Sequence, residues 1–393
     1  MTSSDILDLR ALVVGGQLYR PPDDGNRVEA FIPPLGAENH AANLAELPDG
    51  DLLCAWFAGS AEGSGDIKIA LSRLPAGAAR WQPPVWVSGD PQRSEQNPVL
   101  FPAPDGKLWL LYTAQLTRGC TREEWAARVA AGAASGGFTM QHTAIIRRRI
   151  SEDGGQTWGP VETFSADPGS FCRQPLLVLR NGEWLFPMYF SRPAAGYGDD
   201  HSVVRISADG FRTWQEYPVP DSRGRVQMSV VELAAGRLVA FFRSRAADRI
   251  YSSRSADDGR TWTPPQRTIL PNNNASIQAR KLHSGRIALA FNHFSANDDP
   301  ARTVWPAERY PVTVALSEDG GETWPYMRHV DTGDDFAGPA NTRLNRGLGY
   351  PCLLQTADGL LHVAYSYRPR QCIKYVRFSE GWVMDQRDGV FGG

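Results

Sequence analysis

Six positions along the chain carry residues that could bind or transform a ligand, and each lies nine residues before a glycine in a short turn. Five of these positions are polar: Asn97, Arg173, Gln227, Ser276 and Tyr350. The sixth is Ala41, which follows His40. Each polar residue begins a run, such as RQPLLVLRNG, that otherwise has the pattern of a buried strand. Polar residues grouped above apolar strands are typical of a pocket for a polar ligand. For Ser276 and Asn97, the alternative is that they solvate the wet end of a channel.

The turns that follow these positions form a repeat. Six segments combine a small turn with alternating apolar residues: PDGDLLCAW, PDGKLWLLY, RNGEWLFPM, AAGRLVAFF, HSGRIALAF and ADGLLHVAY. Their glycines are Gly50, Gly106, Gly182, Gly236, Gly285 and Gly359, at spacings of 56, 76, 54, 49 and 74 residues. Such a period suits one four-stranded sheet per hairpin, with loop insertions. The sequence therefore predicts an all-β, six-bladed β-propeller, whose first strands line a central channel.

A second repeat, Ser-x-Asp-x-Gly-x-Thr-Trp, supports the same fold. It is complete at three places and has Phe211 instead of glycine at the fourth: Ser151–Trp158, Ser255–Trp262, Ser317–Trp324 and Ser207–Trp214. We expect the aspartate to accept main-chain hydrogen bonds, the glycine to adopt positive φ and the tryptophan to pack under its blade. A β-sandwich, the rival fold, would show turn signals about every 8–12 residues without this longer period.

The repeats span most of the chain, so we expect residues 1–393 to form a single propeller domain. Residues from 1 to about 25 would then close or flank the ring. The longest irregular stretch, residues 118–137, is rich in alanine and arginine. It is either a short helix in a lid over the site or a surface excursion with no role.

Composition argues against several classes of function. The formal net charge is −2 over 393 residues, so nothing indicates a nucleic-acid or membrane-surface partner. No apolar run reaches the roughly 18 residues of a membrane span, and no phosphate or dinucleotide loop occurs. No metal-binding cluster of His, Asp and Glu is visible, so we expect no cofactor, although a calcium site in the propeller stays open.

The cysteines and the N-terminal residues bear on the cellular compartment. The five cysteines are odd in number and lack CxxC spacing, which argues against a disulfide framework and a zinc site. The first residues, MTSSDILDLRALVVGG, do not form a basic segment followed by an apolar one, as a secretory signal would. We therefore expect a reduced, cytoplasmic protein.

The Asp-box repeats resemble those of the sialidase (neuraminidase) superfamily, and in particular its BNR-repeat, sialidase-like branch, from about residue 38 to 378. Asp-boxes are specific for the fold rather than for an activity, so activity must be argued from the site. In sialidases, three arginines hold the sialate carboxylate. A tyrosine activated by a glutamate is the nucleophile, and an aspartate is the acid and base.

Several of these residues have counterparts here. Tyr350 in GYPCLLQTADG matches the family tyrosine, and Arg243 at the end of VVELAAGRLVAFFR matches the second arginine. Arg309 in RYPVTVALSEDGG matches the third, with a blade-edge salt bridge as the alternative. The loop SAEGSGDIKIALSR offers Glu62 or Asp66, one as the acid and the other as a turn residue. From their ring positions, Arg173, Gln227 and Asn97 are expected to bind substrate.

Two positions depart from the family. His40 stands where the first arginine is expected, and Gln227 stands where the glutamate is expected. A glutamine cannot take the proton of a tyrosine, whose ordinary pKa of about 10 makes it a poor nucleophile near pH 7. Activation of Tyr350 would then depend on Arg243, Arg309 or His40 favouring the phenolate. The alternative for His40 is a hydrogen bond to a neighbouring loop.

Three functions remain open. The first is a sialidase-like exo-glycosidase that acts on a terminal acidic sugar of an oligosaccharide or glycoconjugate. The second is a uronate lyase, in which a cation neutralises the carboxylate, His40 or Tyr350 removes the proton α to it, and an acid protonates the leaving oxygen. Propellers related to this branch include lyases that cleave rhamnosyl–glucuronate linkages. The third is a non-catalytic glycan-binding propeller, which the loss of the glutamate and one arginine favours.

Overall fold

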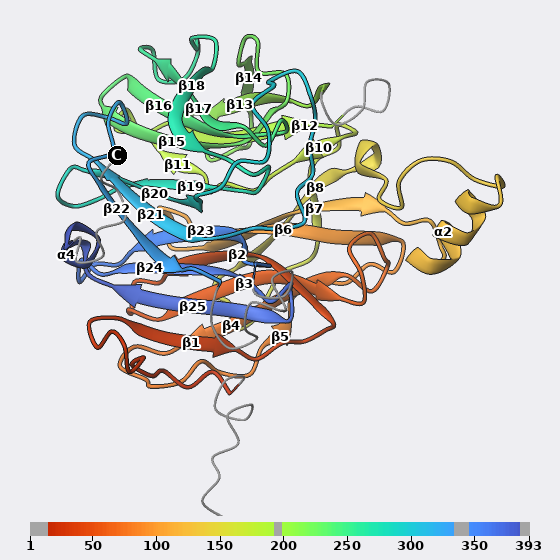
Figure 1. Ribbon diagram of the computed structural model, residues 1–393, viewed down its shortest axis with the longest axis horizontal. Coiled ribbons are helices and arrows are strands. Elements are labelled where there is room, and N and C mark those ends of the chain that lie inside the picture. The colour runs from red at the N-terminus through yellow and green to blue at the C-terminus, as the bar shows by residue number, and fades with distance from the viewer. Residues whose placement is uncertain (1–14, 192–198, 334–345, 386–393) are drawn as a thin grey trace, which may run out of the picture.

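The computed structural model describes residues 15–191, 199–333 and 346–385. Six antiparallel sheets follow one another along this chain and surround a common axis (Figure 1). The first strands of blades I and II, I and VI, IV and V, and V and VI contact one another, so these strands line the centre. The prediction of an all-β, six-bladed β-propeller is confirmed. No helix in the described ranges is long and apolar enough to cross a membrane.

Blade III differs from blades I and II in its innermost strand. Blade I contains β2 (Glu38–Glu46), β3 (Leu52–Gly59), β4 (Lys68–Leu74) and β5 (Val85–Trp86). Blade II contains β6 (Arg93–Pro102), β7 (Leu108–Leu116), β8 (Ile145–Ser151) and β9 (Glu162–Ser165). Blade III contains β10 (Ser170–Phe171), β11 (Leu177–Val178), β12 (Trp184–Phe190), β13 (His201–Ser207) and β14 (Gln215–Pro218). Both β10 and β11 pair with β12, so the innermost strand of blade III is split in two.

The last blade is completed by the N-terminal strand. Blade IV contains β15 (Arg225–Ala234), β16 (Arg237–Ser244), β17 (Arg249–Ser255) and β18 (Gln266–Pro271). Blade V contains β19 (Gln278–Lys281), β20 (Ile287–Asn292), β21 (Val312–Ser317) and β22 (Tyr326–Asp331). Blade VI contains β23 (Gly349–Gln355), β24 (Leu361–Tyr367), β25 (Cys372–Phe378) and β1 (Val28–Ile32). Strand β1 pairs antiparallel with β25, and this pairing closes the ring.

Residues before β1 flank the ring where they are described. Tyr19 pairs with Glu29, and Gln17 forms a bridge with Arg80, whereas residues 1–14 lie outside the described residues. In the described ranges, three short helical segments lie outside the sheets: α2 (Arg122–Ala130), the 3₁₀ turn Gln141–Thr143 and α4 (Glu380–Met384).

The hairpin repeat corresponds to the turn between the first and second strands of each blade. All six predicted glycines have φ between +73° and +89°. A turn in this conformation favours glycine because side chains with a Cβ rarely adopt it. The hairpin spacing therefore located all six blades in the sequence.

The Asp-boxes join the third and fourth strands of blades II to V. In the first box, Asp153 accepts hydrogen bonds from the N–H groups of Gln156 (3.0 Å) and Thr157 (2.8 Å). The hydroxyl of Ser151 accepts a hydrogen bond from the N–H of Gly155 (2.7 Å). Equivalent serine and aspartate contacts occur in the other three boxes.

The Asp-box of blade III, Ser207–Trp214, differs from the others in the packing of its tryptophan. Phe211 is buried with a φ of +61° and packs against Phe164 and Phe186. Trp214 is 39% exposed, whereas Trp324 in the last box is 4% exposed. The prediction that Trp214 packs under its blade is wrong, because the side chain of Phe211 fills the interior there.

A buried ionic cluster joins β1 to the rest of blade VI. The Lys374 ammonium lies 2.8 Å from Asp331 and 3.3 Å from Glu29. The hydroxyl of Tyr365 donates to Asp331 (2.7 Å), and that of Tyr19 donates to Glu29 (2.8 Å). Lys374 thus lies between two buried carboxylates, from β1 and the end of β22, where the ring closes, and Glu29 also pairs with Arg27 at 3.0 Å.

Replacing Lys374 should destabilise this closure. Lys374→Ala leaves Glu29 and Asp331 without their shared cation, and removing one partner of a buried pair typically costs about 3–5 kcal/mol. We expect a loss of this size in urea unfolding. The control is Lys107→Ala, whose exposed pair with Glu152 should leave the unfolding midpoint nearly unchanged. Equal midpoints for the two variants would show that the Lys374 cluster does not stabilise the closing blade.

Candidate active site

The polar positions at the heads of the first strands coincide with backbone irregularities. Four of the six positions have positive φ: Ala41 (+62°), Asn97 (+50°), Gln227 (+53°) and Tyr350 (+57°). The pairing of first and second strands shifts register at each of them. In blade V the positive φ falls on Asn274 (+56°), two residues before Ser276, and Arg173 lies between β10 and β11. Bulges of this kind re-aim side chains, and each strained residue costs on the order of 1–3 kcal/mol.

These irregularities bring polar side chains together around Tyr350. Arg243 donates a hydrogen bond from Nη1 to the Tyr350 hydroxyl. The guanidinium of Arg309 lies 5.0 Å from the centre of the Tyr350 ring, and the His40 ring lies 4.2 Å from it. Arg173 donates to the main-chain oxygen of Tyr350 at 3.2 Å. Residues separated by some 310 positions therefore share one cluster.

Arg243 is a buried cation whose hydrogen-bond acceptors among the described residues are all neutral. Its Nε donates to Asn274 Oδ1 (2.8 Å), and its Nη1 donates to Gln227 Oε1 (3.1 Å). Among the described residues, Nη2 has no hydrogen-bond partner. Burial lowers the pKa of Arg243 to about 10. A guanidinium that is 1% exposed and has no anionic partner in the described part of the chain favours binding of an anion.

The arginines change the acidity of Tyr350. Burial alone would raise the pKa of its phenol, but the charges of Arg243 and Arg309 outweigh burial and lower the pKa to about 8. At pH 7 this corresponds to roughly a tenth of the phenol in the ionised form, instead of a thousandth at an ordinary pKa of about 10. The arginines therefore favour the phenolate in this chain, where Gln227 cannot act as a base.

His40 is held by one ring nitrogen. Its Nδ1 lies 2.6 Å from the hydroxyl of Ser366 on β24, while its buried Nε2 has no hydrogen-bond partner in the described part of the chain. Burial, followed by the charges of Arg370 and Arg309, lowers the pKa of His40 well below 6.5. The imidazole is therefore neutral at pH 7 in the free protein.

Arg173 connects blades across the axis. Its Nε donates to Ser276 Oγ (3.1 Å), and its Nη1 donates to the main-chain oxygens of Ala41 (3.3 Å) and Ala42 (3.0 Å). The structure thus directs these N–H groups at the protein, which corresponds to positioning of Tyr350 rather than to the substrate contact expected for Arg173. Gln227 likewise contacts Arg243. Asn97 is 6% exposed, and its main-chain oxygen accepts from Cys172 Sγ (3.5 Å).

The loop after β3 separates the two acid candidates. Asp66 is exposed, and its carboxylate accepts from the N–H (2.9 Å) and hydroxyl (2.8 Å) of Ser60 in its own loop. These contacts favour the turn-residue alternative for Asp66. Glu62 instead pairs with Arg370 at 2.8 Å. Burial would raise the pKa of Glu62, but Arg370 outweighs burial and lowers it, so Glu62 is ionised at neutral pH.

Three charged residues near the site were missed by sequence reasoning. Arg370, in the turn between β24 and β25, pairs with Glu38 (2.7 Å) as well as with Glu62. Arg245 donates to the buried Asp200 from Nε (2.8 Å) and Nη2 (2.5 Å). The Arg-Ser-Arg spacing could have indicated Arg245, because residues two apart in a strand share a face. No comparable signal marks Arg370 or Asp200.

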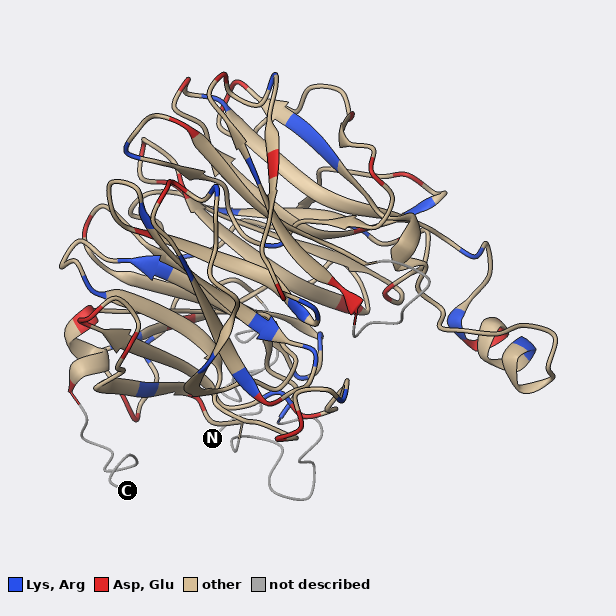
Figure 2. Ribbon diagram, turned by 90° about the horizontal axis from the view of Figure 1, so that it is seen from above, with Lys and Arg blue, Asp and Glu red and all other residues tan. Residues whose placement is uncertain are grey.

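Helix α2, within the excursion at residues 118–137, projects away from the sheets beyond the ends of the strands (Figures 1 and 2) and has no buried residue. Arg122 nevertheless donates to the main-chain oxygen of Glu62 (2.7 Å). The excursion thus contacts the loop that carries Glu62, and its role as a lid stays a prediction.

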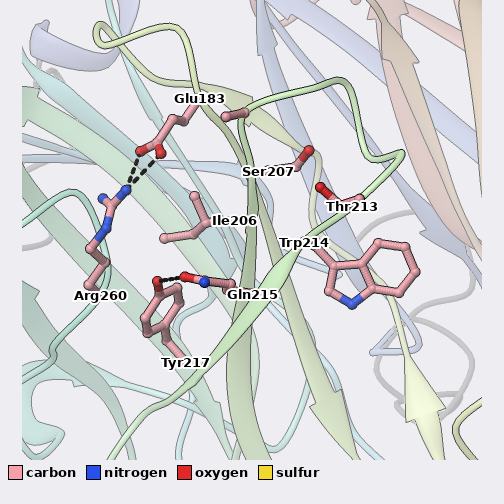
Figure 3. Close-up of a pocket in the computed structure, with 9 residues that line it drawn as sticks. Glu183, Ile206, Ser207, Thr213, Trp214, Gln215, Tyr217 and Arg260 are labelled. Atoms are coloured by element: carbon pink, nitrogen blue, oxygen red, sulfur yellow. Dashed lines mark hydrogen bonds and ion pairs between the residues drawn. The ribbon is translucent and has the colours of Figure 1, made fainter.

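A separate depression of about 340 Å³ lies between blades III and IV (Figure 3). Its charged residues, Glu183 and Arg260, pair with each other at 2.7 Å, and Tyr217 donates to Gln215. It shares no residue with the cluster around Tyr350. In the described ranges, no group of three or more His, Cys, Asp or Glu residues could hold a metal ion.

The acidity of Tyr350 can be measured directly. We expect one phenol to ionise with a midpoint near pH 8 in an ultraviolet difference titration, and this step should be absent in Tyr350→Phe. Arg243→Met should move the midpoint upward, because burial remains while the charge and hydrogen bond are lost. A midpoint unchanged by Arg243→Met would mean that Arg243 does not stabilise the phenolate.

The comparisons with known proteins agree with this geometry. A model of the "BNR repeat-like domain" family matches residues 50–363. A sialidase of Bacteroides fragilis is 23% identical over 297 residues, which cover 70% of this chain and 47% of the relative. The chain thus spans about half the length of that relative.

Solved structures share the fold. A Hadza microbial sialidase superposes with a TM-score of 0.68 at 19% identity, covering 88% of this chain and 66% of that one. A protein of unknown function from Dyadobacter fermentans superposes with the same TM-score of 0.68 at 16% identity, covering 89% and 98%. Since the family model covers most of the repeats, the chain belongs to the BNR repeat-like domain family, within the sialidase/BNR-repeat superfamily.

Proposed function

We propose that this protein is a sialidase-like exo-glycosidase that removes a terminal sugar bearing a carboxylate. The observation that carries the proposal is the buried Arg243 guanidinium. It has neutral acceptors, a hydrogen bond to the Tyr350 hydroxyl and one nitrogen without a partner among the residues that the structure describes. A carboxylate beside Arg243 and Arg309 would supply the missing anionic partner. Guanidinium groups suit this role because their planar N–H groups match both carboxylate oxygens.

Tyr350 is the proposed nucleophile. Its phenolate oxygen attacks the anomeric carbon as the glycosidic bond breaks, and water then releases the sugar from the tyrosine. The pKa of about 8 gives the phenol a usable ionised fraction without a carboxylate base. In this scheme Gln227 and Asn274 orient Arg243, and Arg173 fixes the main chain of Tyr350.

The ionisation state of Glu62 determines whether it can donate or accept a proton in this scheme. Arg370 keeps Glu62 ionised, so in the free protein it is suited to accept a proton from the attacking water rather than to donate one. The first step then favours substrates whose leaving oxygen needs no proton. Glu62→Gln should slow release of the sugar more than cleavage of an aryl glycoside.

The uronate lyase alternative receives less support. A lyase that used His40 as its base would need an imidazole with appreciable basicity, whereas burial and four arginines lower the pKa of His40 well below 6.5. Formation of a conjugated double bond, seen as new ultraviolet absorbance in the product, would identify a lyase. A free reducing sugar without that absorbance would identify a hydrolase.

Tyr350→Phe tests the nucleophile. The change removes one hydroxyl while the ring can still pack against His40, so we expect kcat to fall at least about a hundredfold and ligand affinity to change little. Hydrolysis of 4-methylumbelliferyl sialoside and calorimetric binding of the same compound measure the two effects. In the wild type, the pH profile of kcat/KM should contain an ionisation near pH 8, the pKa of Tyr350 in the free protein, because the phenolate is the reactive form. Near-full activity of Tyr350→Phe would exclude Tyr350 as the nucleophile.

Arg309→Met tests the carboxylate contact. Removing one charge-assisted pair typically costs about 1.5–3 kcal/mol, so binding of the acidic sugar should weaken about tenfold or more. Binding of its methyl ester should change little, because the ester carries no charge. If the wild type bound the ester as tightly as the acid, the proposed carboxylate specificity would be wrong.

A further inference from the structure

We infer that His40 is the third cation of the carboxylate site and binds the ligand carboxylate as an imidazolium. Ligand binding is then coupled to uptake of one proton by His40. This inference rests on the proposed function, and it assigns to a histidine the charge that an arginine would otherwise supply at the head of blade I.

The position of His40 relative to Arg309 supports this assignment. The two side chains meet over Gly349, where an added Cβ would lie 3.3 Å from His40 Cε1 and 3.2 Å from Arg309 Nη1. The imidazole also lies 4.2 Å from the ring of Tyr350. His40 Nε2, which is bonded to Cε1 and has no hydrogen-bond partner among the described residues, therefore belongs to the same cluster as the proposed carboxylate contacts.

The hydrogen bond to Ser366 is compatible with both the neutral and the protonated form of His40. A serine hydroxyl can donate to a neutral Nδ1 or accept from a protonated one. The 2.6 Å contact can therefore persist in both protonation states. A carboxylate in the place of Ser366 would hold the imidazole charged, and a main-chain N–H would hold it neutral.

The surroundings of His40 decide when it becomes charged. The cations that act on it are Arg370, Arg309, Arg173 and Arg243. Two carboxylates, Glu38 and Glu62, already pair with Arg370, and Tyr350 is the neighbouring phenol. In the free protein, burial and the arginines keep the imidazole neutral at pH 7. A ligand carboxylate beside Arg243 and Arg309 offsets their repulsion and attracts a proton to His40.

The change in the pKa of His40 determines how ligand affinity depends on pH. The pKa of His40 is well below 6.5 in the free protein and higher in the complex, so proton uptake occurs between these two values. Affinity for the acidic ligand increases as pH falls through the pKa of the complex. With one proton taken up, the dissociation constant falls by up to about tenfold per pH unit.

The experiment uses the Tyr350→Phe background, in which the ligand is not turned over and the phenol cannot titrate. Binding of 4-methylumbelliferyl sialoside is measured by calorimetry from pH 5 to 8, in buffers that differ in ionisation enthalpy, which gives the number of protons taken up. We expect uptake to approach one proton as the pH falls below 7. The methyl ester of the same compound is the neutral ligand control.

Three further substitutions in the Tyr350→Phe background identify the residue that takes up the proton. His40→Asn, whose amide can still bond Ser366, should abolish the uptake and flatten the pH dependence of affinity. His40→Arg should bind the acid tightly across the range without uptake. Glu62→Gln should retain the uptake, because Glu62 is not the group that gains the proton. Loss of the uptake in Glu62→Gln would overturn the assignment to His40.

NMR signals of the histidine rings measure the pKa of His40 independently of calorimetry. Of the seven histidines, the Cε1 resonance that disappears in His40→Asn should titrate at higher pH in the complex than in the free protein. Preferential binding of the acid without proton uptake, or with uptake that survives His40→Asn, would overturn this inference and leave the proposed function standing. Equal binding of acid and ester would instead overturn the proposed function.

Discussion

The innermost strand of each blade has one edge without a neighbouring strand, and its main-chain groups must find other partners. Buried N–H and C=O groups are costly when unpaired. Side chains from adjacent blades supply many of the partners. Asn43 accepts from the N–H of Leu100 (2.9 Å), and Gln278 accepts from the N–H of Leu353 (2.6 Å). The axis of the ring is therefore polar for a structural reason, before any ligand is considered.

This constraint separates two kinds of polar residue at the axis. Arg173 uses its guanidinium on main-chain oxygens of blades I and VI and on Ser276, so it belongs to the internal hydrogen bonding of the ring. Arg243 and His40 differ, since each keeps a buried nitrogen without a partner among the described residues. The candidate site consists of the polar groups that remain after the strand edges are satisfied. Burial of these groups makes their pKa values differ from those in water.

Sequence reasoning located the repeating parts of this molecule because each is encoded locally. A hairpin glycine and the strand head nine residues before it lie within one short segment, so their spacing is visible without any tertiary information. The convergence of Arg243, Arg309 and Tyr350 followed from that count and from the family resemblance. The bulges themselves, with positive φ at residues such as Gln227, carry no local composition that would reveal them.

The contacts that determine the ionisation states of the side chains could not be predicted from the sequence. Glu62 and Arg370 are 308 positions apart, and only their pairing shows that Glu62 is ionised while Asp66 merely closes a turn. The exposure of Trp214 depended on Phe211 occupying the blade interior, which a single deviation in a repeat does not specify. Side-chain charge and burial are properties of packing between blades, whereas the repeats report on single blades.

The pairing of β1 with β25 also determines when the site can exist during synthesis. The chain leaves the ribosome from its N-terminus, so β1 and the His40 strand emerge long before their partners in blade VI. Five blades could form while the sixth is incomplete, but the junction between blades I and VI would still be open. Three interactions cross that junction. His40 hydrogen-bonds to Ser366, and Glu62 forms an ion pair with Arg370. The N–H of Asn39 donates to the main-chain oxygen of Arg370. Nascent and C-terminally truncated chains therefore lack an assembled site, and the candidate site is complete only after the two ends of the ring have joined.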